Sequence, residues 1–428
     1  MEEKMIMEEK MRAAMYHKFH SPIRIERIPR PQTPSDGVVI CVKASGVCRS
    51  DWHGWAGHDA DILRHGLPFV PGHEFSGIIV RVGPAIKRTD LHVGARVVVP
   101  FILSCGDCVE CSCRNRSTVC TNQQQPGFTM YGSFAEYIAI PRADRNVFLL
   151  PNNISFVEAA ALGCRFTTAY RAVVQQGLQH TNRPNGSVSA IANIAPGSVV
   201  SSQKSPADTT IAIFGCGGVG LSCVMISKAM EVNTIITVDV SDAALEKSRL
   251  CGSTHIFRAP KRSDYSSESE YQNELENLRQ NIMSLTNGGA DICIDAAGFS
   301  STCETAVYCT RRGGRMVQVG LPLHSPPPNI PMGRVVGWEI EIVGSHGFDA
   351  VNDMQNILEL VSLGKLQPKL LVQQEVSLEI GVKALMDMDY DSPLGITMIT
   401  KFANEGSSEG KGKSSASVQC HSFINSSL

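Results

Sequence analysis

The feature that most constrains this chain is a glycine-rich turn between a buried strand and a helix. Residues 209–215 (TTIAIFG) form a short apolar run typical of a strand covered on both faces. Gly215, Gly217 and Gly220 follow in the spacing G-x-G-x-x-G. The first glycine permits a tight turn, the second lets the backbone approach a pyrophosphate, and the third lets the helix pack closely on the strand. This order of elements predicts a dinucleotide-binding unit.

The residues around this turn indicate which dinucleotide is bound. The helix that follows offers its first backbone N–H groups to the phosphates, and Gly218 and Val219 belong to this start. Asp239 ends the next apolar strand, where a carboxylate can accept hydrogen bonds from the adenosine ribose hydroxyls. An acid there repels a 2′-phosphate, and residues 240–242 (VSD) contain no arginine to bind one. We therefore predict NAD; the alternative is a plain glycine turn followed by a surface acid.

Apolar strands alternate with helices throughout this part of the chain. Helices are predicted at 221–230 and 242–252, and further strands at 234–240, 290–298 and 313–321. Strands that alternate with helices form βαβ units and a parallel, doubly wound sheet of the α/β class.

The first third of the chain has a different pattern. Residues 38–46, 76–83 and 95–100 are β-rich runs bounded by proline or glycine. Helical periodicity first occurs at residues 155–164. We predict a β-barrel-like unit in front of the dinucleotide-binding unit.

Composition narrows the range of partners. The 428 residues are 43% hydrophobic and 19% charged, which suits two or three globular units with full cores. The net charge of −2 and the lack of a long basic run argue against nucleic acid and anionic membranes, so the predicted partner is a small molecule. No secretory signal or membrane-spanning stretch is recognisable, and a soluble, cytoplasmic protein is expected.

Two segments carry no recognisable chemistry. Residues 179–208 are rich in serine, asparagine, proline and glycine and are predicted to be an insertion before the first sheet strand. The polar tail, residues 403–428, is predicted to be disordered.

A cluster of cysteines predicts a closed metal site. Cys105, Cys108 and Cys111 are spaced by two residues, and Cys120 follows nine residues later. Four thiolates around a tetrahedral Zn²⁺ leave no open position, so the site would hold a loop in place and perform no chemistry. Cys113 competes with Cys120 for the fourth position; we take Cys120 as the fourth ligand and keep Cys113 as the alternative. A chance cysteine-rich loop or a redox pair is the alternative.

Several segments together resemble the medium-chain zinc-dependent alcohol dehydrogenases, from about residue 11 to residue 402. They occur in the family's order: GVCRSDWHGWAGH, PGHEFSG, CGDCVEC, GSFAEY, AALGCRFTTAYRAV and GCGGVGLS. The resemblance implies a GroES-like β-barrel catalytic domain at 11–165, completed by 335–402, and a Rossmann domain at 166–334. The active site would lie in the cleft between them, and the assembly would be a homo-oligomer.

The resemblance also implies a second, catalytic zinc, and so two zinc ions per chain. Its ligands would be Cys48, His73 and Cys164. Two thiolates and one imidazole leave the fourth tetrahedral position open for a substrate oxygen. Asp51 and Glu74 stand next to these ligands and would support them, Asp51 by accepting the other ring N–H of His73. Read singly, each cysteine would more simply be a buried core thiol, and the acids would be solvated surface groups.

A bound zinc ion would polarise the substrate oxygen, and hydride would pass to the nicotinamide. By the same resemblance, Ser50 lies beside the substrate oxygen and His53 at the outer end of a proton relay. Arg49 would bind the pyrophosphate, and Thr168 and Val319 would contact the nicotinamide.

The pocket assignments are weaker, and the chain departs from the family in places. Trp55 and Phe101 match positions that wall the substrate pocket, although core packing would explain them equally well. The run from Cys111 to Cys120 is one residue longer than usual. Some members carry a pyrophosphate-binding arginine near the C-terminus where this chain has Thr397.

Two other functions stay open at this stage. Polyol-type members often use a carboxylate in place of the third ligand, where this chain has the thiol of Cys164. Quinone-type members lack the zinc ligands altogether. A non-catalytic NAD- or zinc-binding protein on an enzyme fold is the alternative from another class. The predicted function is zinc-dependent, NAD-linked reversible oxidation of an alcohol to an aldehyde or ketone.

Overall fold

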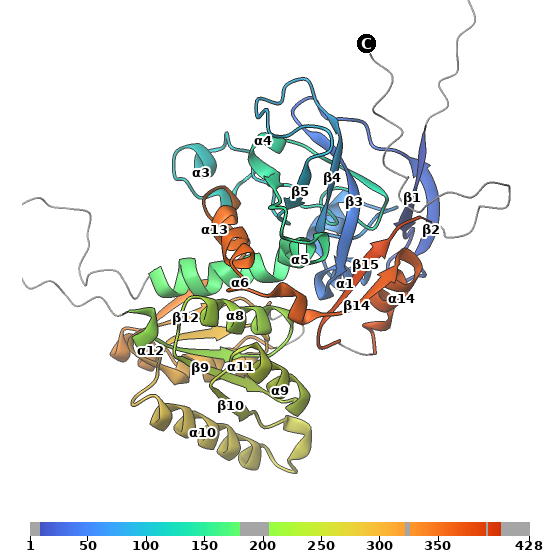
Figure 1. Ribbon diagram of the computed structural model, residues 1–428. Coiled ribbons are helices and arrows are strands. Elements are labelled where there is room, and N and C mark those ends of the chain that lie inside the picture. The colour runs from blue at the N-terminus through green and yellow to red at the C-terminus, as the bar shows by residue number, and fades with distance from the viewer. Residues whose placement is uncertain (1–8, 180–204, 322–325, 391–392, 404–428) are drawn as a thin grey trace, which may run out of the picture.

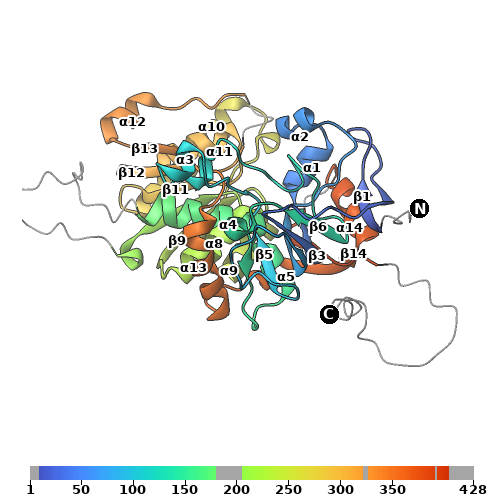
Figure 2. The ribbon, with the colours of Figure 1, turned by 90° about the horizontal axis from the view of Figure 1, so that it is seen from above.

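The chain folds around two β-sheets that lie side by side (Figures 1 and 2). The computed structural model describes residues 9–179, 205–321, 326–390 and 393–403. Most of the predicted insertion and nearly all of the predicted tail lie outside these residues. Among the described residues, no helix combines the length and the apolar character needed to cross a membrane.

The dinucleotide-binding unit is a six-stranded parallel sheet in the order β10-β9-β8-β11-β12-β13. The order reverses at β8, the strand before the glycine turn, and in such sheets ligands bind at this reversal. The strands are β8 (Thr210–Phe214), β9 (Thr234–Asp239), β10 (His255–Arg258), β11 (Ala290–Asp295), β12 (Thr310–Gln318) and β13 (Glu341–Gly344). The α/β, doubly wound prediction is confirmed.

Helices cover both faces of this sheet, because its strands are apolar on both sides. Ile211 and Ile213 face one core, whereas Ala212 and Phe214 face the other. The first core includes residues of α8 and α9, and the second includes residues of α10 and α11. The helices are α8 (Gly218–Ala229), α9 (Asp242–Cys251), α10 (Glu268–Leu285), α11 (Ser300–Cys309) and α12 (Met332–Trp338).

The second sheet has seven strands in the order β14-β15-β3-β4-β5-β7, with β6 also paired to β3. Its strands are β3 (Val38–Val47), β4 (Glu74–Val82), β5 (Arg96–Val99), β6 (Tyr137–Ile140), β7 (Phe148–Leu149), β14 (Val372–Ser377) and β15 (Ile396–Lys401). Strand β15 lies antiparallel beside β3, so the C-terminal part of the chain completes the N-terminal sheet. Strands β1 (Lys10–Met15) and β2 (Arg24–Pro29) form a separate pair.

Shorter elements surround this sheet. They are the helices α1 (Arg49–Trp55), α2 (Ala60–His65), α3 (Val109–Ser112), α4 (Ala143–Asn146), α13 (Ala350–Ser362) and α14 (Leu378–Asp387), and the 3₁₀ turns η1 (Ser117–Val119) and η6 (Pro368–Leu371). Two further 3₁₀ turns belong to the dinucleotide-binding unit: η4 (Pro206–Asp208) leads into β8, and η5 (Arg262–Asp264) follows β10.

One helical run joins the two units. It consists of α5 (Phe156–Ala161), the π-helical η2 (Leu162–Phe166), α6 (Thr167–Tyr170) and the π-helical η3 (Arg171–Leu178). A capping box of Ser155 and Glu158 starts it. It contacts β3 and β4 at its start and α8 further on. A boundary at 165/166 therefore divides a continuous helical segment.

The second predicted boundary, at 334/335, also differs from the structure. It falls inside α12, and β13 follows α12 and pairs in parallel with β12. Residues 335–344 thus belong to the dinucleotide-binding unit, with 341–344 in its sheet, and not to the barrel. Residues 339–343 (EIEIV) alternate acidic and apolar side chains, a pattern that indicates a short strand but not the sheet that it joins, and three of the four residues of β13 are exposed.

Candidate metal centres and active site

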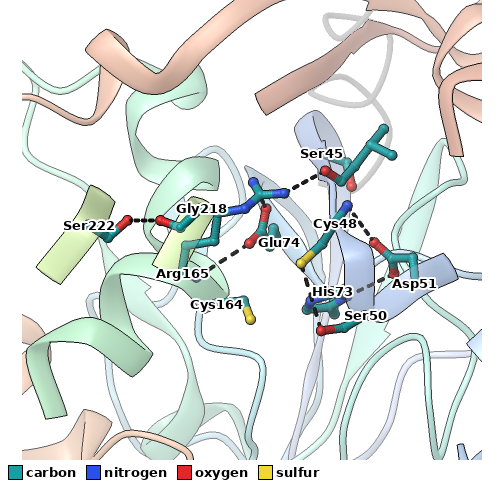
Figure 3. A network of polar contacts seen from close by, with 12 residues as sticks. Ser45, Cys48, Ser50, Asp51, His73, Glu74, Cys164, Arg165, Gly218 and Ser222 are labelled. Atoms are coloured by element: carbon teal, nitrogen blue, oxygen red, sulfur yellow. Dashed lines mark hydrogen bonds and ion pairs between the residues drawn. The ribbon is translucent and has the colours of Figure 1, made fainter. Parts of the chain in front are cut away.

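Four potential metal ligands meet where β3, β4 and the π-helical η2 converge (Figure 3). Cys48, His73, Glu74 and Cys164 each offer one ligand atom, and these four atoms lie within 4.8 Å of one another. All four side chains are buried. The structure thus brings together the three residues predicted to bind catalytic zinc, and adds the carboxylate of Glu74.

The backbone explains this convergence. Cys48 follows β3 and is the N-cap residue of α1, while Glu74 begins β4 with His73 directly before it. Because β3 and β4 are antiparallel, with Gly46 opposite Glu74, these segments meet at one end of the sheet. Gly163 brings η2 against β4, since a Cβ on this residue would lie 2.8 Å from Glu74 Cα.

The carboxylate of Asp51 fixes the imidazole of His73. Oδ1 of Asp51 lies 2.8 Å from Nδ1 of His73 and also accepts the backbone N–H of Gly72, while Oδ2 accepts the N–H of Cys48. An acceptor-only carboxylate places the ring proton on Nδ1, which leaves the lone pair on Nε2. That buried Nε2 has no hydrogen-bond partner among the described residues. A buried, unpartnered acceptor beside two thiols fits a metal ion.

The pKa values of the Cys48 and Cys164 thiols are shifted in opposite directions. A hydrogen bond from Cys164 lowers the pKa of the Cys48 thiol well below its usual range, with the charge of Arg165 and the contact with His73 acting in the same direction against burial. The pKa of the Cys164 thiol is raised, because its hydrogen bond with Cys48 and its burial both disfavour the thiolate. A pair that readily holds one thiolate suits a metal site, since metal binding displaces the remaining proton.

Glu74 is shared between this cluster and a buried arginine. Arg165 Nη1 donates to Glu74 Oε2 at 2.7 Å, and both side chains are buried. Burial raises the pKa of Glu74 to about 8, although the charge of Arg165 opposes the shift. The sequence analysis did not single out Arg165. The available signal was weak: Arg165 and Arg171 are the two charges in the otherwise apolar helical run 159–174, and a charge that is buried there needs a partner.

A pocket of about 280 Å³ opens onto the cluster. The predicted relay residues Ser50 and His53 lie in its wall, and Ser50 Oγ lies 3.8 Å from Cys48 Sγ. Nδ1 of His53 is 3.3 Å from Nδ1 of His58. The wall consists of Ser50, His53, His58, Asp59, Ala60, His73, Phe101, Gln125, Phe128, Cys164, Leu321 and His346. It combines aromatic surface with several hydrogen-bonding groups. Gln125, Phe128 and His346 belong to this wall and were not predicted, because chain-distant segments supply them. His58 was not predicted either, although it follows His53 by only five residues.

The glycine turn has the geometry that its three glycines require. Gly215 has a φ of 95°, and a Cβ there would lie 2.8 Å from Ala297 Cβ. A Cβ on Gly220 would lie 1.8 Å from the carbonyl oxygen of Gly215, so helix and strand touch there. Around a Cβ on Gly217, by contrast, no described atom lies within 4 Å. Gly215 and Gly220 are needed for close packing, whereas Gly217 leaves space that a pyrophosphate can occupy.

The first helical residues and the acid after β9 surround this space. Gly217 is the N-cap of α8, so the helix begins at Gly218, three residues earlier than predicted, and Val219 is in its first turn. Asp239 Oδ2 accepts the backbone N–H of Cys216 at 2.6 Å, and Oδ1 accepts that of Ser241 at 2.8 Å. The carboxylate is therefore held against the turn and remains partly exposed.

The cysteine cluster folds into a separate lobe. The sulfurs of Cys105, Cys108, Cys111 and Cys120 lie within 4.8 Å of one another. Cys113 is exposed, and its sulfur lies 3.6 Å from the hydroxyl of Ser112. The structure thus brings Cys120, and not Cys113, to the other three cysteines. These are the two groups of histidine, cysteine and acidic side chains that are close enough to hold a metal within the described ranges.

Comparison with known proteins identifies the family. A model of the alcohol dehydrogenase GroES-like domain matches residues 34–152, and a model of the zinc-binding dehydrogenase matches residues 218–362. An alcohol dehydrogenase of Geobacillus stearothermophilus is 31% identical, over 85% of this chain and 92% of its own length. The chain belongs to the medium-chain zinc-dependent alcohol dehydrogenase family.

Other members of the family differ in the substrate that their names give. A sorbitol dehydrogenase of Bacillus subtilis is 32% identical to this chain, over 86% of this chain and 91% of its own length. The crystal structure of an alcohol dehydrogenase from Aeropyrum pernix has a TM-score of 0.71 and is 26% identical, with 91% of this chain and 99% of that one covered. The GroES-like and Rossmann units predicted from the sequence are confirmed.

The residues predicted to line the substrate pocket or to contact the nicotinamide differ in their surroundings. Phe101 lines the pocket, whereas Trp55 is packed in the barrel core with its Nε1 donating to Ser21 O at 2.7 Å. The prediction of Trp55 as a pocket wall is corrected in this way: its ring fills the core. Thr168 is buried on α6, and Val319 is half-buried just after β12.

Arg49 is the residue predicted to bind the pyrophosphate, and Thr397 stands where some members carry a pyrophosphate-binding arginine. The guanidinium of Arg49 lies 3.8 Å above the ring of Trp52 and donates to the carbonyl oxygen of Met388. Thr397 is buried in β15 opposite Val47, and its hydroxyl accepts a hydrogen bond from Gln374 Nε2 at 3.0 Å. Thr397 is thus a sheet residue with its hydroxyl engaged.

Proposed function

We propose that this dehydrogenase catalyses the zinc-dependent, NAD-linked and reversible oxidation of an alcohol to an aldehyde or ketone. One observation carries the proposal. The buried, unpartnered Nε2 of His73 lies among the thiols of Cys48 and Cys164, at the inner end of a pocket whose wall includes both His73 and Cys164. Three ligands of this kind leave one coordination position free for a substrate oxygen.

The chain's own residues have separate roles in this reaction. A zinc ion at Cys48, His73 and Cys164 supplies Lewis-acid chemistry that favours loss of the alcohol proton. Ser50 receives that proton beside the substrate oxygen, and His53 passes it toward solvent, because a histidine can take up and release a proton near neutral pH. The second zinc, at Cys105, Cys108, Cys111 and Cys120, fixes its lobe and takes no part in the reaction.

The turn after β8 and the acid after β9 support NAD as the cofactor. The space at Gly217 receives the pyrophosphate, with the N–H groups at the start of α8 directed toward it. The partly exposed carboxylate of Asp239 binds the ribose hydroxyls and disfavours a 2′-phosphate. Thr168 and Val319 would contact the nicotinamide, and Arg49, whose guanidinium lies over the ring of Trp52, would bind the pyrophosphate.

A polyol is the second candidate substrate. The relative named sorbitol dehydrogenase is as similar to this chain as the relatives named alcohol dehydrogenase. The pocket wall also contains Gln125, His58 and His346, which can bond to hydroxyl groups beyond the reacting one. Phe101 and Phe128 favour a flat or apolar substrate instead. A substrate panel therefore has to contain both kinds of alcohol.

The dinucleotide-binding sheet supports a homo-oligomer. Among the described residues its edge strand β13 pairs with β12 alone, and Ile342 on it is exposed. The side chains of Met332 and Val336 on the adjacent α12 are exposed as well. An exposed strand edge with apolar side chains beside it favours pairing with a second copy of the chain.

The decisive experiment measures NADH formation with primary, secondary, aromatic and polyhydric alcohols, together with zinc per chain. We expect turnover of at least one alcohol and two zinc ions per chain. Cys164→Ala should retain one zinc ion and lose activity about a thousandfold or more, since Lewis-acid catalysis contributes several kcal/mol. Cys223→Ala is the matched control, because Cys223 is a buried thiol on α8 outside both clusters. Equal activity of Cys164→Ala and the control would refute the ligand assignment, and zinc at the four-cysteine lobe alone would favour a non-catalytic protein.

A further inference from the structure

Arg165 is a buried cation between the ligand cluster and the glycine turn (Figure 3). It directly follows Cys164 on η2 and is 5% exposed. A guanidinium at this depth must satisfy its donors within the protein, and its partners show which parts of the molecule it connects.

One end of the side chain is bound to the ligand cluster. Nη1 donates to Glu74 Oε2 at 2.7 Å, and Nη2 donates to the backbone carbonyl of Val47 at 2.6 Å. Val47 directly precedes Cys48 in the chain. The guanidinium therefore holds the backbone before one predicted ligand and the carboxylate that lies within 4.8 Å of all three.

The middle of the same side chain packs on the glycine turn. A Cβ on Gly218 would lie 2.7 Å from both Cδ and Nε of Arg165. Gly218 has an ordinary helical backbone, so any residue could adopt its conformation, and the space that the glycine leaves is filled by the arginine. Arg165 thus contacts Gly218, the first residue of α8, at the turn that would face the pyrophosphate.

We propose that Arg165, acting with Glu74, is a positioning residue that couples dinucleotide binding at the Gly218 turn to metal binding at the cluster of Cys48, His73 and Cys164. The inference rests on the proposed function, since it requires that both ligands bind. It adds that each ligand raises the affinity of the chain for the other.

The charges determine the direction of this coupling. The carboxyl group of Glu74 accepts a hydrogen bond from Arg165 and also lies within reach of a metal ion, so the two cations compete for one carboxyl group. A bound divalent ion attracts Glu74 and repels the guanidinium, which leaves more positive charge beside the glycine turn. An anionic dinucleotide at the turn attracts the guanidinium and releases Glu74 toward the metal. Coupling between two sites is reciprocal, so both ligands should bind more tightly together.

The test measures the dissociation constant of NADH by fluorescence in zinc-loaded and in metal-depleted full-length protein. In the wild type we expect NADH to bind at least about fivefold more tightly when zinc is present. The double variant Arg165→Met with Glu74→Gln removes both charges of the pair and should bring this ratio to about one. Arg165→Lys keeps the positive charge and should retain part of the effect of zinc on NADH affinity.

A second variant perturbs the contact from the other side. Gly218→Ala leaves every charge in place but displaces the arginine, and it should also reduce the ratio. Arg315→Lys is the matched control, because Arg315 is a buried arginine that donates to Gln176 O at 2.8 Å and pairs with Glu341, away from the cluster. It should keep the wild-type ratio.

The outcomes separate this inference from the proposed function. A wild type that binds neither zinc at the cluster nor NADH contradicts the proposed function. A wild type that binds both with a ratio of one contradicts the coupling alone. An unchanged ratio in the double variant, or an equal loss in Arg315→Lys, would also overturn the role of Arg165.

Discussion

Asp51 Oδ1 and His73 Nδ1 lie 2.8 Å apart in the buried interior, and this contact determines which nitrogen of the imidazole can bind a metal. The carboxylate accepts two backbone N–H groups in addition, from Gly72 and Cys48, so its position is fixed before any metal arrives. The carboxylate of Asp51 on α1 thus binds both residues that directly precede β4, Gly72 and His73.

Asp51→Asn should lower the affinity of the cluster for zinc about tenfold to a hundredfold, as is typical when the partner of a ligating histidine is removed. The amide keeps the shape but offers one acceptor oxygen fewer and no charge. Competition with a chelator measures the affinity. Asp291→Asn is the control, because Asp291 is a buried carboxylate that accepts the N–H of Thr210 in the other sheet. Equal zinc affinity of the two variants would contradict the role of Asp51.

Cys120→Ser and Cys113→Ser should differ sharply, although they delete thiols of the same loop. Cys120 lies among the other three sulfurs, so its loss should remove one zinc ion and lower the melting temperature by several degrees. Cys113 is exposed, and its replacement should change stability by no more than about 0.5 kcal/mol. Zinc analysis and thermal unfolding measure both effects. The opposite pattern would assign the fourth position to Cys113.

Gly217→Ala and Gly220→Ala should separate cofactor binding from folding. A methyl group on Gly217 meets no described atom within 4 Å, so the variant should melt near the wild-type temperature but bind NADH at least about tenfold more weakly. A methyl group on Gly220 meets a carbonyl oxygen at 1.8 Å and should cost about 3 kcal/mol or more. NADH fluorescence titration and thermal unfolding are the measurements. Unchanged NADH binding by Gly217→Ala would remove the pyrophosphate from this turn.

Asp239→Asn should shift cofactor preference toward NADP. Loss of the negative charge weakens the repulsion of a 2′-phosphate, and we expect the ratio of kcat/KM for NADH to that for NADPH to fall about tenfold or more. Asp242→Asn is the control, because this exposed acid pairs with Arg258 at 3.5 Å and lies three residues further along. A wild type that already prefers NADPH would contradict the assignment of NAD.

The local patterns of the sequence determined the glycine turn, the alternation of strands and helices, and the cysteine-rich loop. Each depends on residues that are near one another in the chain: Gly215 and Gly220 are five apart, and Cys105 to Cys120 span one loop. Backbone constraints and short ligand spacings act over such distances, so they can be read without a fold. The observed ends of these strands lie within about three residues of the predicted ends.

Only the tertiary structure could decide what depends on contacts between distant residues. Cys48 and Cys164 are 116 residues apart, and spacing alone gave no indication that they share a site. The resemblance to a family supplied that expectation, and β3, β4 and η2 bring the side chains together. Nor could the sequence exclude Cys113 as the alternative to Cys120, move Trp55 from the pocket to the core, or place β13 in the dinucleotide-binding sheet. Burial and pairing are properties of the packed chain, and so is the buried Arg165 between the cluster and the turn.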